Sequence, residues 1–275
     1  MFSLPPGRPA LMGILNVTPD SFSDGGFHLA PEEAIRAAER MMEEGADLID
    51  VGGESTRPGA AEVPVEEELS RVLPVVRELR RKRIPVSIDT RKPEVAKAAL
   101  DLGAKVVNDV FGFRDPAMIA ACAPYDCSIC IMHMQGTPET MQAAPRYQNV
   151  VEDIREWLLE QVGRCIQGGI NRKRIWIDPG IGFGKTVEHN LQILKGLGLL
   201  TGTDLPVLVG VSRKSFIGRI LGAQDTPLRV DDRLEGTLAA QVLAQAAGAR
   251  IIRTHDVKAS RRAIEMAAAI QNSPV

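Results

Sequence analysis

The chain has 275 residues, of which 44% are hydrophobic and 25% are charged, and its formal net charge is -2. This composition is typical of a globular protein that buries a full core. The nearly balanced charge argues against nucleic acid or a membrane surface as a partner, and no apolar run approaches the ~20 residues of a membrane span. The N-terminal residues lack the pattern of a signal peptide, so we expect a cytoplasmic protein.

Apolar, strand-like runs alternate with amphipathic stretches of helical spacing along the whole chain. We predict eight strands, at residues 10–17, 47–53, 84–89, 104–110, 127–134, 174–178, 206–211 and 249–254. Eight strand–helix units in one chain of this length predict an α/β fold, a single (β/α)8 TIM barrel. A doubly wound sheet is the alternative, but no glycine fingerprint follows the first strand. We expect residues 1–275 to form one domain.

The segments between the predicted strands begin and end with helix signals. Helices are predicted to begin near residues 31, 65, 93, 115, 149, 187, 231 and 257. Pro31 and Pro93 suit a first helical turn, and Asp115 suits an N-cap. Glycines that suit helix C-caps precede several strands, at positions 45, 103, 168, 169 and 248.

The four cysteines and two of the histidines do not predict a metal or redox site. Cys127 and Cys130 are three residues apart on a predicted strand, so their side chains point to opposite faces. We therefore expect all four cysteines, including Cys122 and Cys165, to be buried and inert. His133 and His189 fit satisfied or solvated side chains better than ligands.

An unusually polar segment follows the first predicted strand. Residues 18–26 read Thr-Pro-Asp-Ser-Phe-Ser-Asp-Gly-Gly, which is more polar residues than a turn needs. Phe22 lies among these acceptors and hydroxyls. Two interpretations stay open, namely a mobile segment that closes over a ligand and a polar connection between a strand and a helix.

Polar residues lie at the C-terminal ends of nearly all the predicted strands, and in a barrel these ends face one mouth. A buried polar group costs free energy unless it is paired, so their recurrence predicts a common polar pocket. The residues concerned include Asn16, Asp89, Asn108, Asp178, Lys214, Arg253 and His255.

These residue types suit a ligand with two parts. Asp89, Asn108 and Asp178 suit the edge of a flat heterocycle that presents hydrogen-bond donors, as carboxylates suit a guanidinium fork. Lys214 could reach a carbonyl oxygen or nitrogen of the same ring. Arg253 and His255, with Asn16 and Arg57 nearby, suit phosphate oxygens.

Two further features bear on the binding of such a ligand. The oxygens of Asn16 and Asp24 are hard ligands that suit Mg²⁺. Residues 180–185, Gly-Ile-Gly-Phe-Gly-Lys, are glycine-rich but lack the spacing of a P-loop. We expect these glycines to let the backbone approach a ligand, with Phe183 as an apolar wall.

Several strings in the chain resemble those of the bacterial dihydropteroate synthase family. They are Met-Gly-Ile-Leu-Asn-Val-Thr-Pro-Asp-Ser-Phe-Ser-Asp-Gly-Gly from residue 12, Gly-Gly-Glu-Ser-Thr-Arg-Pro-Gly from 52, Ser-Ile-Asp-Thr from 87, Asn-Asp at 108, Asp-Pro-Gly-Ile-Gly-Phe-Gly-Lys from 178, Ser-Arg-Lys-Ser from 212 and Arg-Thr-His-Asp from 253. The resemblance runs in order over almost the whole chain, and the first and fifth of these strings are long and specific.

The resemblance implies a reaction in folate biosynthesis. 6-Hydroxymethyl-7,8-dihydropterin diphosphate would react with p-aminobenzoate to give 7,8-dihydropteroate and pyrophosphate. The implied catalytic residues are Asp89, Lys214, Arg253 and His255. The resemblance also implies a Mg²⁺ cofactor, a homodimer and inhibition by sulfonamides.

The family's binding roles carry over to matching positions. The pterin ring would bind to Asp89, Asn108, Asp178 and Lys214. The diphosphate would bind to Asn16, Arg253 and His255, with Mg²⁺ near Asn16 and Asp24. The p-aminobenzoate pocket would be formed by Phe22, Thr56, Arg57, Pro58, Phe183 and Ser215.

Two rival functions would use the same barrel. A pterin-binding methyltransferase would share the ring-binding Asp and Asn positions, but would not need Thr56, Arg57 and Pro58 or the phosphate pair of Arg253 and His255. A non-catalytic pterin-binding protein could lack the polar segment after the first strand or the phosphate pair, and both are present here.

Overall fold

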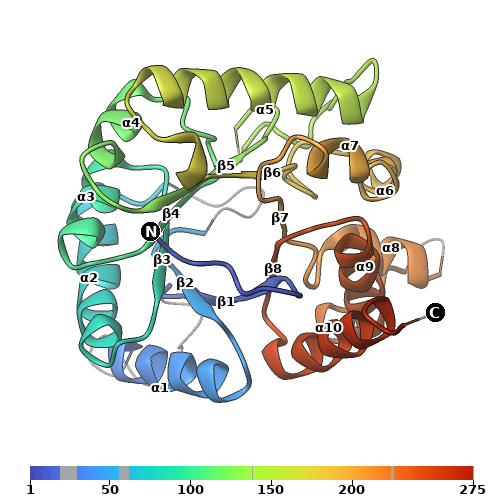
Figure 1. Ribbon diagram of the computed structural model, residues 1–275, viewed down its shortest axis with the longest axis horizontal. Coiled ribbons are helices and arrows are strands. Elements are labelled where there is room, and N and C mark those ends of the chain that lie inside the picture. Colours follow the sequence, from blue (N-terminus) through green and yellow to red (C-terminus); the bar gives the residue numbers. More distant parts are fainter. Residues whose placement is uncertain (19–29, 56–61, 138, 224–225, 275) are drawn as a thin grey trace.

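Eight parallel strands form the centre of the molecule in the computed structural model, and helices surround them (Figure 1). The structure describes residues 1–18, 30–55, 62–137, 139–223 and 226–274. The strands are β1 (Ala10–Asn16), β2 (Leu48–Gly52), β3 (Val86–Asp89), β4 (Val106–Asp109), β5 (Ser128–Met132), β6 (Ile175–Asp178), β7 (Leu208–Val209) and β8 (Ile251–Thr254).

The strands pair in the order β6-β5-β4-β3-β2-β1-β8-β7. A single parallel bridge between Ile177 and Val207 joins the two ends of this order. The sheet therefore closes on itself, and the prediction of a (β/α)8 TIM barrel is confirmed.

The described helices follow the strands in turn. They are α1 (Ala30–Glu43), α2 (Val65–Arg81), α3 (Pro93–Asp101), α4 (Pro116–Cys122), α5 (Val150–Gln167), α6 (Val187–Lys195), α7 (Gly198–Thr201), α8 (Ser215–Leu221), α9 (Leu234–Ala246) and α10 (Val257–Gln271). Asp115 accepts a hydrogen bond from the backbone N–H of Ala117, so its predicted N-cap role is confirmed. Thr186 and His189 form a capping box at the start of α6. No helix in these described ranges is long and apolar enough to cross a membrane.

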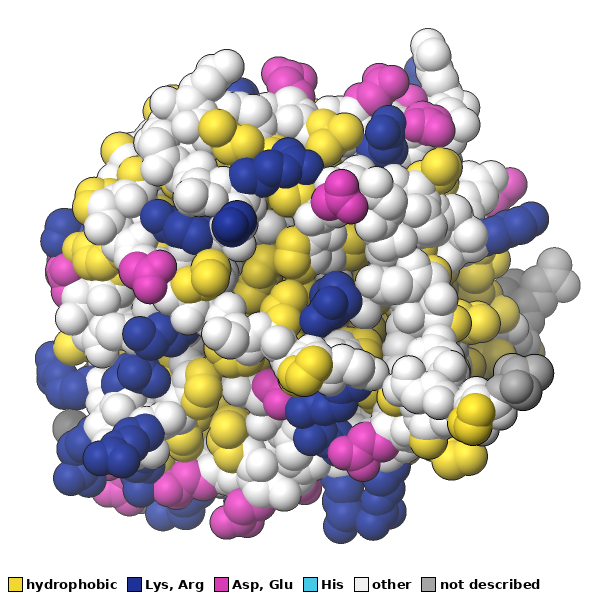
Figure 2. Space-filling model, viewed as in Figure 1, with side chains coloured by type: hydrophobic (Ala, Val, Ile, Leu, Met, Phe, Trp, Pro, Cys, Tyr) yellow, Lys and Arg dark blue, Asp and Glu magenta, His cyan; other side chains and the backbone are white. Residues whose placement is uncertain are grey.

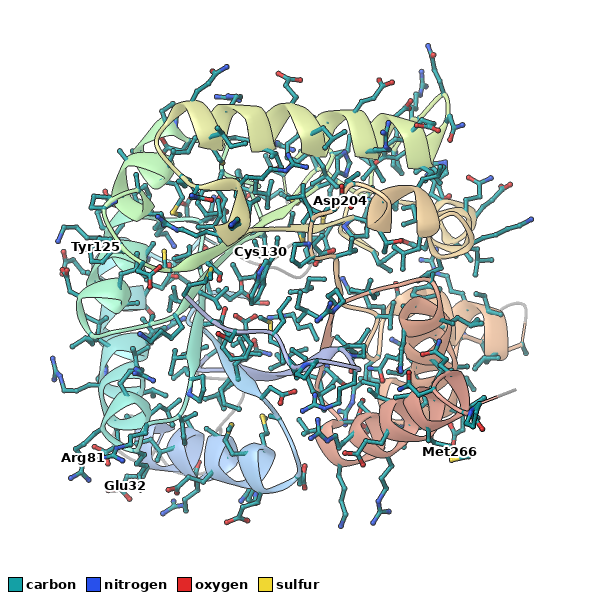
Figure 3. All side chains as sticks on the ribbon, viewed as in Figure 1. Glu32, Arg81, Tyr125, Cys130, Asp204 and Met266 are labelled. Atoms are coloured by element: carbon teal, nitrogen blue, oxygen red, sulfur yellow. The ribbon has the colours of Figure 1, made fainter. Side chains whose placement is uncertain are left out.

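The alternation of side chains along each strand sends core residues either outward to the helices or into the barrel. Outward-facing residues such as Ile49 and Val51 pack with the helices in one large cluster. Inward-facing residues such as Leu48 and Cys130 form a smaller cluster inside the barrel, and Cys130 is labelled near the middle of the molecule in Figure 3. Phe2 packs edge-on against the inner residue Trp176, with 6.1 Å between the ring centroids, so the N-terminal segment covers this apolar end.

The strand and helix predictions are correct in number and position for the main units, but they miss short elements. The four-residue α7 and the seven-residue α8 were not predicted. The strand predicted at 206–211 is reduced to Leu208–Val209, and Val207 forms only an isolated bridge with Ile177. The helix predicted from residue 231 begins at Leu234, after a 3₁₀ turn at Val230–Asp232.

The predicted burial of the cysteines and the predicted cap glycines are confirmed. All four cysteines are buried and unpaired, and Cys127 and Cys130 pack in different clusters. The backbone has positive φ at glycines 45, 103, 169 and 248, as helix C-caps require.

Candidate active site

A pocket opens at the C-terminal ends of the strands. Its lining combines charged groups with apolar walls: Ile14, Asp89, Asn108, Val110, Met132, Asp178, Gly180, Ile181, Phe183, Gly210, Ser212, Lys214, Arg253 and His255. Seven predicted site residues therefore meet in one pocket: Asp89, Asn108, Asp178, Phe183, Lys214, Arg253 and His255. The position of this pocket is the one that active sites occupy in such barrels.

The floor of the pocket is an ion-paired network inside the barrel. Arg253 on β8 donates from Nε to Oδ2 of Asp50 at 2.6 Å and from Nη2 to Oδ2 of Asp89 at 2.7 Å. Asn108 on β4 donates from Nδ2 to the same Asp50 oxygen at 3.0 Å. The network thus ties together strands that lie apart in the sheet order.

Three oxygens of this network are buried without a hydrogen-bond partner among the described residues: Oδ1 of Asp50, Oδ1 of Asp89 and Oδ1 of Asn108. An unpaired buried acceptor is costly, and a ligand that supplies N–H donors would remove that cost. Asp89 and Asn108 are register partners on neighbouring strands, and both line the cavity. The pocket therefore offers adjacent acceptors to a ligand with a donor-rich edge.

Burial changes the acidity of the pocket carboxylates. Burial raises the pKa of Asp89 to about 7, although the charge of Arg253 acts to lower it, and Asp50 raises it further. Burial also raises the pKa of Asp178, whose Oδ1 accepts from the backbone N–H of Gly180 at 2.7 Å. The carboxylates are therefore poised to gain a proton more easily than exposed ones.

Lys214 lies on the opposite side of the pocket from the β3–β4 acceptors. Its ammonium donates to the carbonyl of Ile181 and lies 4.0 Å from the centroid of the Phe183 ring. Burial lowers the pKa of Lys214 to about 7, against the opposing effect of Asp178. Phe183 is thus the apolar wall that the sequence predicts, and it packs against a cation.

His255 is oriented by Ser212. The Ser212 hydroxyl accepts from the backbone N–H of His255 at 3.1 Å and lies 3.0 Å from its Nδ1. If the hydroxyl donates its own proton to Nδ1, Nε2 carries the ring proton and can donate to a ligand oxygen. This arrangement suits a phosphate oxygen.

The other predicted site residues lie outside this lining. Asn16 ends β1 and is half-buried, and Ser215 is exposed at the start of α8. Phe22, Asp24, Thr56, Arg57 and Pro58 lie outside the described residues. The described residues contain no cluster of three or more His, Cys, Asp or Glu side chains that could hold a metal ion.

Sequence reasoning missed two polar residues of the site. Asp50 lies within the strand predicted at 47–53 and has no predicted role, although it alternates with the inward Leu48 and that spacing could have placed it inside the barrel. Ser212 was likewise quoted without a role. His133 is buried and bonded to Lys185 at 3.0 Å, in agreement with its prediction as a satisfied histidine.

A barrel whose mouth presents buried carboxylates, an amide and a lysine defines a class of enzymes that bind a flat, nitrogen-rich ring. The pterin binding enzyme family matches residues 12–255. A dihydropteroate synthase of Escherichia coli (strain K12) is 47% identical over 265 residues, which cover 96% of this chain and 92% of that protein.

Solved structures agree with this class. The Yersinia pestis dihydropteroate synthase in a sulfonamide drug complex has a TM-score of 0.91 and 44% identity, over 99% of this chain and 98% of that one. The Xanthomonas albilineans dihydropteroate synthase in complex with 7,8-dihydropteroate has a TM-score of 0.87 and 42% identity, over 97% and 95%. The chain belongs to the dihydropteroate synthase family of pterin binding enzymes.

Proposed function

We propose that the protein condenses 6-hydroxymethyl-7,8-dihydropterin diphosphate with p-aminobenzoate to give 7,8-dihydropteroate and pyrophosphate. The observation that carries this proposal is the pair of buried, unpartnered acceptors on Asp89 and Asn108. An aminopyrimidinone edge presents N–H donors that would satisfy both. Asp178 and Lys214 would hold the remaining polar atoms of the ring.

The reaction needs a leaving group rather than a protein nucleophile. The nitrogen of p-aminobenzoate forms a bond to the methylene carbon, the carbon–oxygen bond to the diphosphate breaks, and the arylammonium proton is lost to solvent. Nη1 of Arg253, whose Nε and Nη2 are engaged, and Nε2 of His255 would donate to diphosphate oxygens as charge develops there. Asp89 would favour positive charge on the pterin methylene.

We also propose that Mg²⁺ binds at Asn16 and Asp24. The amide oxygen of Asn16 is a suitable hard ligand at the pocket end of β1. Substrate phosphates and waters commonly fill most of the coordination positions of Mg²⁺, so two protein ligands are enough for such a site. When bound, the ion would neutralise charge on the leaving diphosphate. Loss of turnover in EDTA, with recovery on added Mg²⁺, would support this assignment, and unchanged turnover in EDTA would refute it.

The aryl substrate would bind beside the pterin ring. Phe183 and Ser215 would contribute to its pocket with Phe22, Thr56, Arg57 and Pro58, which the resemblance assigns to it. We propose that p-aminobenzoate binds second, after the diphosphate, and that sulfonamides compete with it. Binding of p-aminobenzoate to the free protein as tight as its binding with pterin and pyrophosphate present would contradict that order.

The reaction is tested by measuring pyrophosphate release from the dihydropterin diphosphate, with and without p-aminobenzoate. Release that depends on p-aminobenzoate supports the synthase. No release under either condition would exclude it and leave the methyltransferase or a non-catalytic binding protein. Arg253→Ala should lower turnover more than about tenfold, which corresponds to ~1.4 kcal/mol of activation free energy.

We further propose a homodimer of single-domain chains. Three exposed apolar side chains support a contact surface, namely Leu243 on α9 and Met266 and Ile270 on α10, which are 66%, 62% and 64% exposed. Figure 2 shows apolar side chains at the lower right edge, where α9 and α10 lie in Figure 1, and Met266 is labelled at the outer edge of α10 in Figure 3. The four reduced, buried cysteines suit the cytoplasm, where we propose that the protein works.

A further inference from the structure

Asp50 lies beneath the pocket and contacts two of its ligand-binding side chains. Its side chain is buried on β2 and is not part of the cavity lining. One oxygen, Oδ2, accepts from Nε of Arg253 at 2.6 Å and from Nδ2 of Asn108 at 3.0 Å. Asp50 therefore reaches the ligand-binding side chains of Arg253 and Asn108 through hydrogen bonds, without lining the cavity itself.

The contact determines which end of the Asn108 amide meets the ligand. A carboxylate paired with a guanidinium is an acceptor only, so the Asn108 atom that faces Asp50 must be the NH₂ group. The Asn108 carbonyl oxygen is then the atom left buried without a protein partner, beside the free oxygen of Asp89. If the amide were rotated by half a turn, the pocket would present a donor there and would repel the donor edge of the ring.

The same oxygen also fixes the guanidinium of Arg253. With Nε held by Asp50 and Nη2 held by Asp89, the plane of the guanidinium is set by two bonds to two different strands. Without Asp50, Arg253 would keep only its bond to Asp89 and could rotate about it.

We propose that Asp50 is a positioning residue for pterin recognition, which orients the Asn108 amide and holds the Arg253 guanidinium through one shared oxygen. The identity of the ligand in this inference rests on the proposed function. The positioning itself is a property of the three side chains and is tested by binding of 6-hydroxymethylpterin, without turnover.

The variants separate the acceptor atom from the charge. In Asp50→Ala both partners lose their acceptor, and the dissociation constant for 6-hydroxymethylpterin should rise by about tenfold or more, as for a lost hydrogen bond to a charged group. Asp50→Asn keeps an oxygen at the same place, so it should bind the pterin more tightly than Asp50→Ala does. In turnover, the Michaelis constant of p-aminobenzoate should stay unchanged in Asp50→Asn.

Asp47→Ala is the matched control. Asp47 precedes the same strand at its other end, and its carboxylate also accepts from an arginine, Arg8, at 2.7 and 2.8 Å. Asp47→Ala should lower the melting temperature and leave pterin affinity unchanged. If Asp50→Ala binds the pterin within about twofold of wild type, or if Asp50→Asn binds no better than Asp50→Ala, the proposal is wrong.

A direct measurement covers the case in which Asp50→Ala does not fold. A neutron structure of the wild-type protein with 6-hydroxymethylpterin should show the two deuterium atoms of the Asn108 amide on the Asp50 side. Deuterium atoms that face the ligand would overturn the proposal. Wild-type protein that binds the pterin in this way but releases no pyrophosphate would contradict the proposed reaction and leave the role of Asp50 intact.

Discussion

At the scale of single residues, the pocket holds an acid and a base whose pKa values are displaced toward each other. Burial raises the pKa of Asp89 to about 7 and lowers the pKa of Lys214 to about 7. Below this pH Asp89 gains a proton and loses an acceptor. Above it Lys214 loses its charge. We therefore expect pterin affinity to be greatest near pH 7 and to fall on both sides.

Two substitutions separate the limbs of this pH profile. Lys214→Arg should remove the alkaline fall, since a guanidinium keeps its proton throughout the range. Asp89→Asn should remove the acid fall and weaken binding at every pH. The measurement is the dissociation constant of 6-hydroxymethylpterin from about pH 5 to pH 9. An alkaline limb that persists in Lys214→Arg would exclude Lys214 as its origin.

Gly180 permits a close backbone contact at the pocket. Its φ is +66°, and a Cβ placed there would lie 1.9 Å from the carbonyl oxygen of His133. Gly180→Ala should therefore move the chain that holds Asp178, abolish pterin binding and destabilise the fold by roughly 1–3 kcal/mol.

Gly163→Ala is the control for this steric prediction. Gly163 lies inside helix α5, and nothing lies within 4 Å of a Cβ built there. Alanine should stabilise the helix by up to about 1 kcal/mol. Chemical unfolding and pterin binding measure both variants, and a Gly180→Ala protein with normal binding would contradict the steric argument.

The sequence predicts polar residues at strand ends that the structure brings together in one pocket, but it does not single out Asp50, which lies behind that lining. Asp178 stands out because it ends an apolar strand, where a buried charge is costly, and Lys214 lies in the polar string Ser-Arg-Lys-Ser after another strand. The role of Asp50 depends on Arg253, which is 203 positions away in the chain. A pairing of this kind follows from closure of the barrel, and no local pattern encodes it.

At the scale of elements, a buried ion network joins β2, α2 and α3. Lys92, just before α3, donates to Glu68 on α2 and to Glu54 after β2. Glu54 also accepts from Arg91 and from the backbone N–H of Val63. Glu54 therefore fixes the chain on both sides of residues 56–61. This range contains Thr56, Arg57 and Pro58, to which the resemblance assigns a role in binding p-aminobenzoate.

Removal of the cation from this network should be costly. Glu68 is fully buried, so Lys92→Met would leave its charge without a partner and should lower the free energy of unfolding by ~3–5 kcal/mol. The double variant Glu68→Leu/Lys92→Met should recover much of this loss, because the fully buried charge of Glu68 is removed and Glu54 keeps its pairing with Arg91. Urea unfolding measures all three proteins, and a single variant as stable as wild type would show that the pair is dispensable.

Element boundaries were predictable where periodicity was long. Helix α5 covers 18 residues and begins within one residue of the start predicted near residue 149. Helix α8 has only seven residues, of which Phe216 and Ile217 are buried by tertiary contacts. So short a segment has no helical period to detect, and its helix depends on packing that the sequence does not display.

At the scale of the whole molecule, one buried histidine should couple stability to pH. Burial lowers the pKa of His133 to about 2, and the nearby Lys185 lowers it further. In the unfolded chain a histidine gains its proton near pH 6.5, whereas in the folded state His133 stays neutral. Its contribution to stability is therefore present above pH ~6.5 and is lost as the pH falls from there toward 2.

His133→Asn tests this coupling, because asparagine can still accept from Lys185 but does not titrate. Between pH ~6.5 and ~4.5 the wild-type free energy of unfolding should fall more steeply than that of the variant, by up to ~1.4 kcal/mol per pH unit. His189→Asn, at the α6 capping box, serves as the control. Equal slopes for wild type and His133→Asn would contradict the assignment.

The proposed dimer surface is also a property of the whole molecule. Leu243→Glu together with Met266→Glu should place charges in the contact and yield a monomer in sedimentation experiments. Leu199→Glu, on α7, is a control at another exposed apolar position and should leave the dimer intact. A wild-type protein that sediments as a monomer would refute the dimer itself.

Among the described strands, β6 and β7 are the neighbours with the fewest paired residues, since a single bridge between Ile177 and Val207 joins them. Asp178 ends the first of these strands, and Lys214 follows the second. A pterin ring held by both residues would link β6 to β7. Its contacts would add to the few backbone hydrogen bonds between these two strands. Binding of the pterin would then stabilise the barrel at this seam, and without ligand the barrel would open most easily between β6 and β7.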